Sequence, residues 1–267
     1  MDGEPIAPER RHTLFFLHEV RAFAPVFIDT EVDMTTVLAC QAAAGRQGTR
    51  YSVVSYVLWS VGRVLAEHPE ANAAIRGRLR PRVLRHSTVN AKVALDKTMG
   101  GQRVALSAVL RDIQRATLDD IQRQVARYRD GDPERMPEFA AVRRLHRRPW
   151  LSGLRRFRKV ARPLGKRAYV FGTVAVTSLG HRPVDGFHSV GGTTITLGLG
   201  RIVDRPVVRA GEITVAPVMR LNLAFDHRVI DGAEAADVLA ALKQSLESFT
   251  AEPAAGERSA ALSADQH

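Results

Sequence analysis

The chain has 267 residues, 45% of them hydrophobic and 25% charged, which is the balance of a globular protein with a sizeable core. No apolar run approaches the roughly 18 residues that span a bilayer, and the N-terminal stretch lacks the apolar centre of a signal peptide. A single cysteine, Cys40, excludes an internal disulfide, and no Cys/His cluster has metal-ligand spacing, so a reducing cytoplasm is the simplest location.

The first half of the chain alternates predicted helices and strands. Residues 1–10 are expected to be a disordered N-terminus. The alternating stretch APVFIDTEVDM predicts a strand, after which Asp33 and Thr35 can cap a helix. A long apolar helix is predicted from Ser52 to His68, where Pro69 ends it. The stretch TVNAKVALDKTMGGQRVALSAVL predicts two strands around a Gly-Gly turn.

The second half predicts more strands and a final helix. A polar helix over about residues 117–129 is halted by DGDP. Three or four strands are predicted in RAYVFGTVAVTSLG, TTITLGLGRIV and RPVVRAGEITVAPVMRLNLAFDH, and a helix over about residues 232–249. The tail 251–267 is expected to be disordered. No internal repeat is apparent, so we expect one α/β domain, residues 11–250, around a mixed sheet flanked by helices.

The net charge of +11 comes from one segment. Residues 143–167 contain eleven Lys or Arg and no acid, so the rest of the chain is formally neutral. Apolar residues recur there at helical spacing, which predicts a basic amphipathic helix. Four interpretations stay open: contact with the phosphates of a ligand, docking of an acidic protein, adsorption to anionic lipid, or a packed helix with a solvated face. Nucleic-acid binding is not expected, because no recognised nucleic-acid motif accompanies the arginines.

The stretch LAFDHRVIDG joins the last predicted strand to the last helix. Alternation puts His227 on the apolar side at the strand's end. Asp231 falls at the N-cap with Glu234 three residues later, the arrangement of a capping box. The local pattern alone therefore leaves two interpretations open, a catalytic base or a polar residue beside a well-capped helix.

A wider match makes the stretch more specific. DHRVIDG resembles the His-x-x-x-Asp-Gly motif shared by the catalytic domains of 2-oxoacid dehydrogenase dihydrolipoamide acyltransferases and by chloramphenicol acetyltransferase. GTVAVTSLG, TLGLGRIVDRPVVRAGEITVAPVMRLNLAFDHR, GAEAADVLAALKQSLE, VFIDTEVDMTTVLA and VLAEHPEANA are also similar to that family. The resemblance covers about residues 11–250. It implies the chloramphenicol acetyltransferase-like fold and a homotrimer with active sites between subunits.

The resemblance also implies roles for individual residues. His227 would remove a proton from a thiol or hydroxyl acceptor, which then attacks an acyl thioester. The family's oxyanion-stabilising serine aligns with Thr177, which keeps the hydroxyl, and the adjacent Ser178 is the substitute candidate. Because side chains alternate along a strand, these two cannot both face His227. Asp231 matches the aspartate that holds the site, and Arg11 is its candidate partner.

The resemblance therefore predicts an acyltransferase. It would move an acyl group, expected to be acetyl, from a coenzyme A thioester to an acceptor, without a metal. For the basic segment 143–167, the phosphates would then be those of coenzyme A and the acidic protein an acyl carrier protein. Our first hypothesis is a stand-alone O-acyltransferase of small molecules. The alternatives are a dihydrolipoamide acyltransferase served by a lipoyl domain on another chain, and a non-catalytic scaffold. The pair Asp96-Lys97 looks like a lipoylation site, but the acidic residue that normally precedes the pair is absent, so no covalent lipoyl group is expected.

Overall fold

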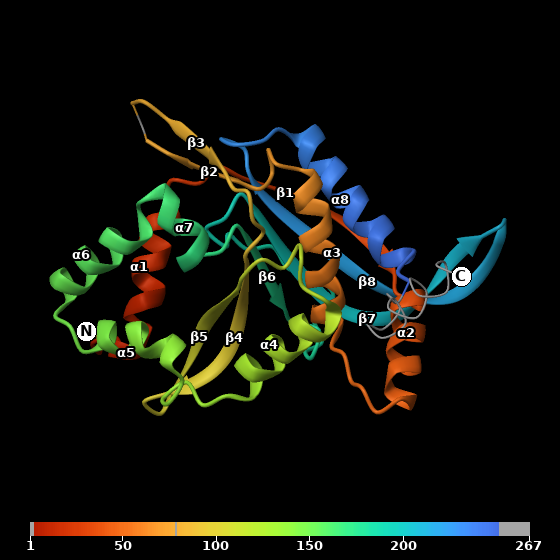
Figure 1. Ribbon diagram of the computed structural model, residues 1–267, viewed down its shortest axis with the longest axis horizontal. Coiled ribbons are helices and arrows are strands. Elements are labelled where there is room, and N and C mark those ends of the chain that lie inside the picture. The colour runs from red at the N-terminus through yellow and green to blue at the C-terminus, as the bar shows by residue number, and fades with distance from the viewer. Residues whose placement is uncertain (1–2, 78, 251–267) are drawn as a thin grey trace, which may run out of the picture.

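The computed structural model describes residues 3–77 and 79–250, and its centre is a six-stranded mixed sheet (Figure 1). The strand order is β1-β8-β7-β6-β4-β5. Pairs β4–β6 and β6–β7 are parallel and the other three are antiparallel. The strands are β1 (Pro25–Asp33), β4 (Ala91–Met99), β5 (Gln102–Leu110), β6 (Val174–Ser178), β7 (Ile195–Arg209) and β8 (Glu212–Asp226). A separate two-stranded sheet pairs β2 (Ala73–Arg76) with β3 (Arg82–Arg85). The predicted mixed sheet is confirmed.

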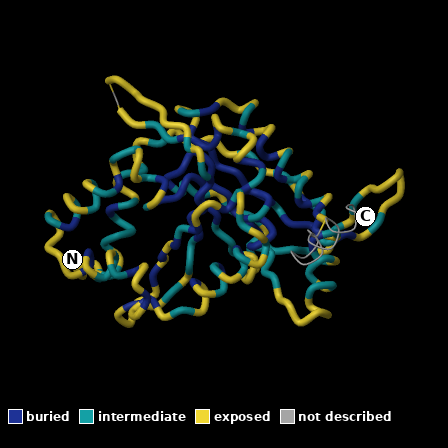
Figure 2. Tube along the Cα trace, in the orientation of Figure 1, coloured by how far each residue is buried: buried dark blue, intermediate teal, exposed yellow. Residues whose placement is uncertain are grey.

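Helices cover one face of the sheet and build the core there. They are α2 (Thr35–Arg46), α3 (Val53–Glu67), α4 (Leu118–Asp130) and α8 (Gly232–Glu247). Buried strand residues of that face, such as Val176, Leu197 and Leu223, join buried residues of α3 and α8 in a single apolar cluster. Figure 2 shows the buried residues concentrated along these central elements. This burial is the main force that holds the fold together.

The loop that contains Asp185 and Phe187 crosses the opposite face of the sheet, and its backbone lies very close to that of β7. A Cβ atom on Gly198 would lie 2.3 Å from the carbonyl oxygen of Phe187, and one on Gly200 would lie 1.8 Å from that of Asp185. Only glycine admits the loop at these two positions of β7. The glycines in TLGLGRIV therefore serve backbone packing.

A second group of helices lies at one end of the molecule (Figure 1). It comprises the 3-10 turns η1 (Pro8–Arg10) and η2 (Pro137–Phe139) and the helices α1 (Arg11–Val20), α5 (Ala140–His146), α6 (Trp150–Ala161) and α7 (Leu164–Val170). The basic segment 143–167 thus spans three short helices instead of one, because prolines precede α6 and α7. Pro8–Arg10 forms a 3-10 turn at the end of the stretch 1–10 that was expected to be disordered. The tail 251–267 lies outside the described residues.

Several local predictions are confirmed. Ser52 caps α3, which ends before Pro69. Gly100 and Gly101 form the β4–β5 turn with φ of +57° and +75°. The polar helix predicted over about residues 117–129 is α4, and the structure adds a capping box of Thr117 and Asp120 at its start. No helix in the described ranges is both long enough and apolar enough to span a membrane.

Candidate active site

His227 lies in the turn that directly follows β8. Its backbone N–H donates to the carbonyl of Ala24 at 2.9 Å, which ties the turn to the segment leading into β1. Its ring lies 5.5 Å from that of Phe225, between centroids. The imidazole side chain is 47% exposed. A ring fixed through its main chain and open to solvent can accept a proton from a bound molecule.

Asp231 stands at the N-cap of α8, as predicted, but its side chain caps nothing. Its Oδ1 lies 3.4 Å from Nδ1 of His227. Glu234 does not complete a capping box either, since its carboxylate contacts Nδ1 of His68 at 3.0 Å. The predicted capping box is therefore wrong, because both carboxylates face histidines. A carboxylate beside Nδ1 favours a proton there and leaves Nε2 free to act as the base.

Two residues that the sequence analysis did not single out hold the turn. Asp226 is 2% exposed and accepts from Nε and Nη2 of Arg228 at 2.8 and 2.5 Å. It also accepts from the backbone N–H of Ala24 and Arg228, each at 3.3 Å. The guanidinium of Arg228 lies 5.0 Å from the ring of Phe23. Asp226 and Arg228, the residues before and after His227, thus form a clamp that holds the turn. Their opposite charges in the sequence were the signal from which this pair could have been predicted.

Thr177 and His227 lie far apart within one chain. Thr177 pairs with Gly198, which pairs with Asn222, and His227 is five residues beyond Asn222. At about 3.3 Å per residue and about 4.8 Å per strand, the separation is about 16 Å along the strands and about 10 Å across them. The two side chains therefore cannot reach one acyl carbonyl from the same chain.

Ser178 and Thr177 occupy opposite faces of β6, since adjacent strand residues alternate. The Ser178 hydroxyl accepts from the backbone N–H of Gly180 at 3.4 Å and so stays within its own turn. Thr177 shares its face with Ala175, and the loop covers that face at Gly191. Of the two hydroxyls, that of Thr177 lies on the face away from the helical core.

Arg11 does not pair with Asp231 in the described part of the chain. Its Nη1 donates to the carbonyls of His146 and Arg148 at 2.8 and 2.7 Å. These contacts fasten α1 to the end of α5, because a guanidinium satisfies carbonyls that a helix end leaves free. The predicted partnership is therefore not formed within this chain, and Arg11 instead supports the basic segment.

A cationic group lies behind the clamp. Arg167, on α7, donates to the carbonyl of Gly192 at 2.7 Å and lies 5.9 Å from the Phe23 ring. Lys92 is 8% exposed, donates to the carbonyl of Gly191 and lies 4.4 Å from the Phe16 ring. Burial, followed by repulsion from Arg167, lowers the pKa of Lys92 to about 7. These cations hold the loop 191–192 against α1 and α7.

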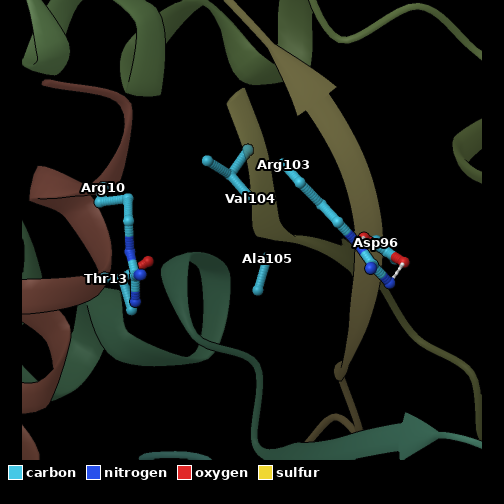
Figure 3. A pocket seen from close by; sticks show the side chains of 6 residues that line it. All are labelled: Arg10, Thr13, Asp96, Arg103, Val104 and Ala105. Atoms are coloured by element: carbon cyan, nitrogen blue, oxygen red, sulfur yellow. Dashed lines mark hydrogen bonds and ion pairs between the residues drawn. The ribbon is translucent and has the colours of Figure 1, made fainter. Parts of the chain in front are cut away.

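A hollow of about 300 Å³ lies between the start of α1 and the β4–β5 hairpin (Figure 3). Arg10 and Thr13 face Val104 and Ala105 across it, and Arg103 is paired with Asp96 at its rim. None of the predicted site residues lines this hollow. Lys97, the residue of the lipoylation-like pair, is on β4 and donates to the carbonyls of Arg129 and Gly131 at 2.5 and 2.7 Å.

Comparison with curated proteins gives dihydrolipoyllysine-residue acyltransferases. The succinyltransferase component of the 2-oxoglutarate dehydrogenase complex of Escherichia coli is 26% identical over 82% of this chain and 48% of that protein. Its Haemophilus influenzae counterpart is 24% identical over 82% and 47%. The acetyltransferase component of the Bacillus subtilis pyruvate dehydrogenase complex is 54% identical over 50 residues, 19% of this chain and 11% of that protein. The chain spans at most about half the length of these relatives.

Comparison with solved structures gives the same fold. A probable dihydrolipoamide acetyltransferase from Listeria monocytogenes superposes with a TM-score of 0.68 at 19% identity, covering 96% of this chain and 98% of the other. The cubic core of the pyruvate dehydrogenase multienzyme complex gives 0.69 at 20%, covering 93% and 92%. The dihydrolipoamide acetyltransferase of Azotobacter vinelandii gives 0.69 at 19%, covering 93% and 92%.

The family match itself is broad and has one gap. The sequence model described as the catalytic domain of 2-oxoacid dehydrogenases acyltransferase matches residues 2–134 and 163–252. Residues 135–162, which hold η2, α5 and α6, fall between the two matched parts. Because the match covers most of the sequence, this chain belongs to the acyltransferase catalytic-domain family of the 2-oxoacid dehydrogenases.

Proposed function

We propose that the chain transfers an acyl group between coenzyme A and a dihydrolipoyl thiol, with His227 as the general base. The observation that carries this proposal is the exposed imidazole on its clamped turn, with the Asp231 carboxylate 3.4 Å from Nδ1. The Azotobacter vinelandii relative was studied for the catalytic roles of a serine, a histidine and an asparagine, the last two four positions apart. His227 and Asp231 have the same spacing, with aspartate in place of asparagine.

The reaction follows from the chemistry of a thiol and a thioester. Nε2 of His227 takes the proton of the attacking thiol, and the thiolate forms a bond to the acyl carbonyl carbon. The tetrahedral intermediate then collapses, the bond to the first sulfur breaks, and the imidazolium returns its proton to the departing thiolate. A free thiol has a pKa of about 8.5, so a base that removes its proton near neutral pH makes the nucleophile available.

The negative oxygen of the intermediate needs a fixed hydrogen-bond donor. We assign this role to the hydroxyl of Thr177 from a second copy of the chain, because the distance within one chain is too long. A donor of this kind commonly contributes about 10²- to 10³-fold to kcat. This arrangement makes the working unit an oligomer, for which a homotrimer with sites between neighbours is the proposed form.

The acceptor we favour is protein-borne dihydrolipoamide. Each relative above is named for a dihydrolipoyllysine residue, and two of them align over 82% of this chain. The small-molecule hydroxyl that the sequence analysis placed first has no comparable support. A thiol acceptor also asks less of a histidine base than an alcohol does, since its proton is far easier to remove.

The test is acyl transfer by the purified protein from acetyl-CoA and succinyl-CoA to dihydrolipoamide and to simple alcohols. We expect release of free coenzyme A that depends on the presence of dihydrolipoamide. His227→Ala should abolish it, while His18→Ala, an exposed histidine on α1, should not. Equal background rates for all three proteins would instead favour a non-catalytic scaffold, and transfer to alcohols alone would restore the O-acyltransferase.

A further inference from the structure

The segment that the family model leaves unmatched forms a compact addition beside α1. Phe15 of α1 contacts Trp150 and Phe157 of α6, with ring centroids 4.8 and 6.0 Å apart. The α6 backbone approaches closely, because a Cβ atom on Gly153 would lie 3.1 Å from the Phe15 ring. The apolar face of α6 is therefore already used inside the protein.

Two arginines, one in α6 and one at its C-cap, also hold α6 against α1. Arg158 and Arg162 both pair with Glu19 of α1, each with a 2.9 Å contact from Nε. Residues 139–184 contain no Asp or Glu, so these arginines have no acidic partner in their own segment and pair with Glu19 of α1 instead. These pairs fasten the addition to α1 and fix which side of α6 faces outward.

The outward side carries cations without an acidic partner. Arg144, Arg147, Arg148, Arg155, Arg156 and Lys159 are all exposed, and none forms an ion pair with a residue in 3–77 or 79–250. Between them, Trp150 is 42% exposed and Leu151 68% exposed. We call these eight residues the α5–α6 surface. Figure 2 shows exposed residues along this end of the molecule.

The composition of the α5–α6 surface fits an acidic protein. A helix that enters a lipid surface inserts its whole apolar face, but Phe157 of α6 packs on Phe15 of α1, and the exposed large apolar residues of α6 are Trp150 and Leu151 in its first turn. From Trp150 to Lys159 α6 rises about 14 Å, and the exposed arginines continue before it to Arg144, which is more surface than the phosphates of one nucleotide require. Arginine forks match carboxylates, and an exposed tryptophan beside arginines is typical of protein interfaces.

The α5–α6 surface is linked to the turn of His227 through α1 and the residues that follow it. Glu19, which binds α6, is five residues before Ala24, whose carbonyl receives the N–H of His227. Five residues span at most about 18 Å even when extended. A carrier seated on the α5–α6 surface can therefore present a group on a long flexible arm to the imidazole.

We propose that the α5–α6 surface docks a lipoyl-bearing domain with an acidic face and so delivers the dihydrolipoyl thiol to His227. This inference rests on the proposed function for the identity of the carried group, and it adds the surface that selects the carrier. Charge attraction raises the rate at which the lipoyl domain encounters the surface and orients the domain there. The surface should therefore affect the reaction of a domain-borne thiol and not that of free dihydrolipoamide.

The experiment compares two matched double charge reversals, R155E/R156E on α6 and R46E/R50E. Arg46, at the end of α2, and Arg50 are exposed, and α2 and α6 lie at opposite ends of the molecule (Figure 1). Binding of a purified acidic lipoyl domain is measured by calorimetry at low and high salt, using proteins that also carry His227→Ala so that no chemistry occurs. We expect R155E/R156E to weaken binding about tenfold at low salt and R46E/R50E to leave it unchanged, because a docked charge contact is local.

The kinetic counterpart uses proteins with His227 intact. R155E/R156E should lower kcat/KM for the lipoyl domain by a similar factor and leave kcat and KM for free dihydrolipoamide unchanged, which also shows that the variant is folded. Equal effects of the two double variants, salt-independent binding, or binding only to an acyl carrier protein or to phosphatidylglycerol vesicles would overturn the proposal. If free dihydrolipoamide is not acylated by any variant, the proposed function fails, while the calorimetry still decides whether the surface docks the domain.

Discussion

The charged residues on either side of His227 do more for the candidate site than the sequence pattern indicated. Asp226 and Arg228 look like ordinary flanking charges, yet one is buried and the other forms two hydrogen bonds to it. A buried carboxylate that loses its partner is left with an uncompensated charge, which is costly. The clamp therefore links the stability of the chain to the placement of its histidine.

Arg228→Ala should lower the free energy of unfolding by about 2 kcal/mol, because it leaves the buried Asp226 carboxylate without its cation. The loss is smaller than for a fully buried pair, since the Arg228 side chain is partly exposed. It should also reduce acyl transfer by loosening the turn. The control is Arg103→Ala, which breaks the fully exposed pair with Asp96 and should leave the free energy of unfolding nearly unchanged, because solvent screens an exposed pair. Urea unfolding and steady-state rates of both variants check this, and equal destabilisation would contradict it.

Lys92 provides a second prediction at this scale. The pKa of Lys92 in the folded protein, about 7, lies below the ordinary lysine value of 10.5, so the unfolded chain holds a proton that the folded chain releases between those pH values. The contribution of Lys92 to the free energy of unfolding is therefore complete above its unfolded pKa of 10.5 and is lost as the pH falls towards 7. The advantage of Lys92→Met over the wild type should therefore shrink by roughly 3 kcal/mol between pH 7 and pH 9.5. A difference in unfolding free energy that does not change with pH would refute this.

At the scale of elements, the sequence predicted what local patterns control. The helix α3, the Gly-Gly hairpin of β4 and β5 and the polar helix α4 depend on neighbouring residues, and all three were predicted. The alternation in β6 also correctly separated Thr177 from Ser178. The partners of Arg11 and Glu234 were not predictable, because they come from residues far along the chain.

The contact between α1 and α5 should be sensitive to acid. Nδ1 of His12 lies 2.9 Å from Nε2 of His146. Burial, with repulsion from His12, lowers the pKa of His146 from 6.5 to about 4, and burial also lowers the pKa of His12. Their contribution is complete above pH 6.5 and is lost as the pH falls towards 4.

We therefore expect the wild type to lose roughly 3 kcal/mol more than His146→Gln between pH 6.5 and pH 4, since glutamine keeps a hydrogen bond and takes up no proton. Unfolding curves of both proteins across this range measure the difference. Parallel losses in the two proteins would show that the histidine pair does not control the acid sensitivity.

At the scale of the whole molecule, the sheet separates the two groups that the proposed reaction needs. The register of β6, β7 and β8 sets His227 and Thr177 at opposite ends of two strands, β8 and β6, that are separated by β7. A motif in one stretch of sequence suggests a site within one chain, but pairing between strands decides where the second group lies. The central claim is that one active site takes His227 from one copy and Thr177 from another.

Complementation between two inactive variants tests this claim most directly. His227→Ala and Thr177→Val should each lose at least about 100-fold in kcat, and Thr177→Ser, which keeps the hydroxyl, should retain activity. If the two inactive chains are co-expressed and assemble at random, about one quarter of the sites between neighbouring copies combine an intact His227 with an intact Thr177. The account predicts recovery of about a quarter of the wild-type rate, whereas no recovery from a mixed oligomer would contradict it.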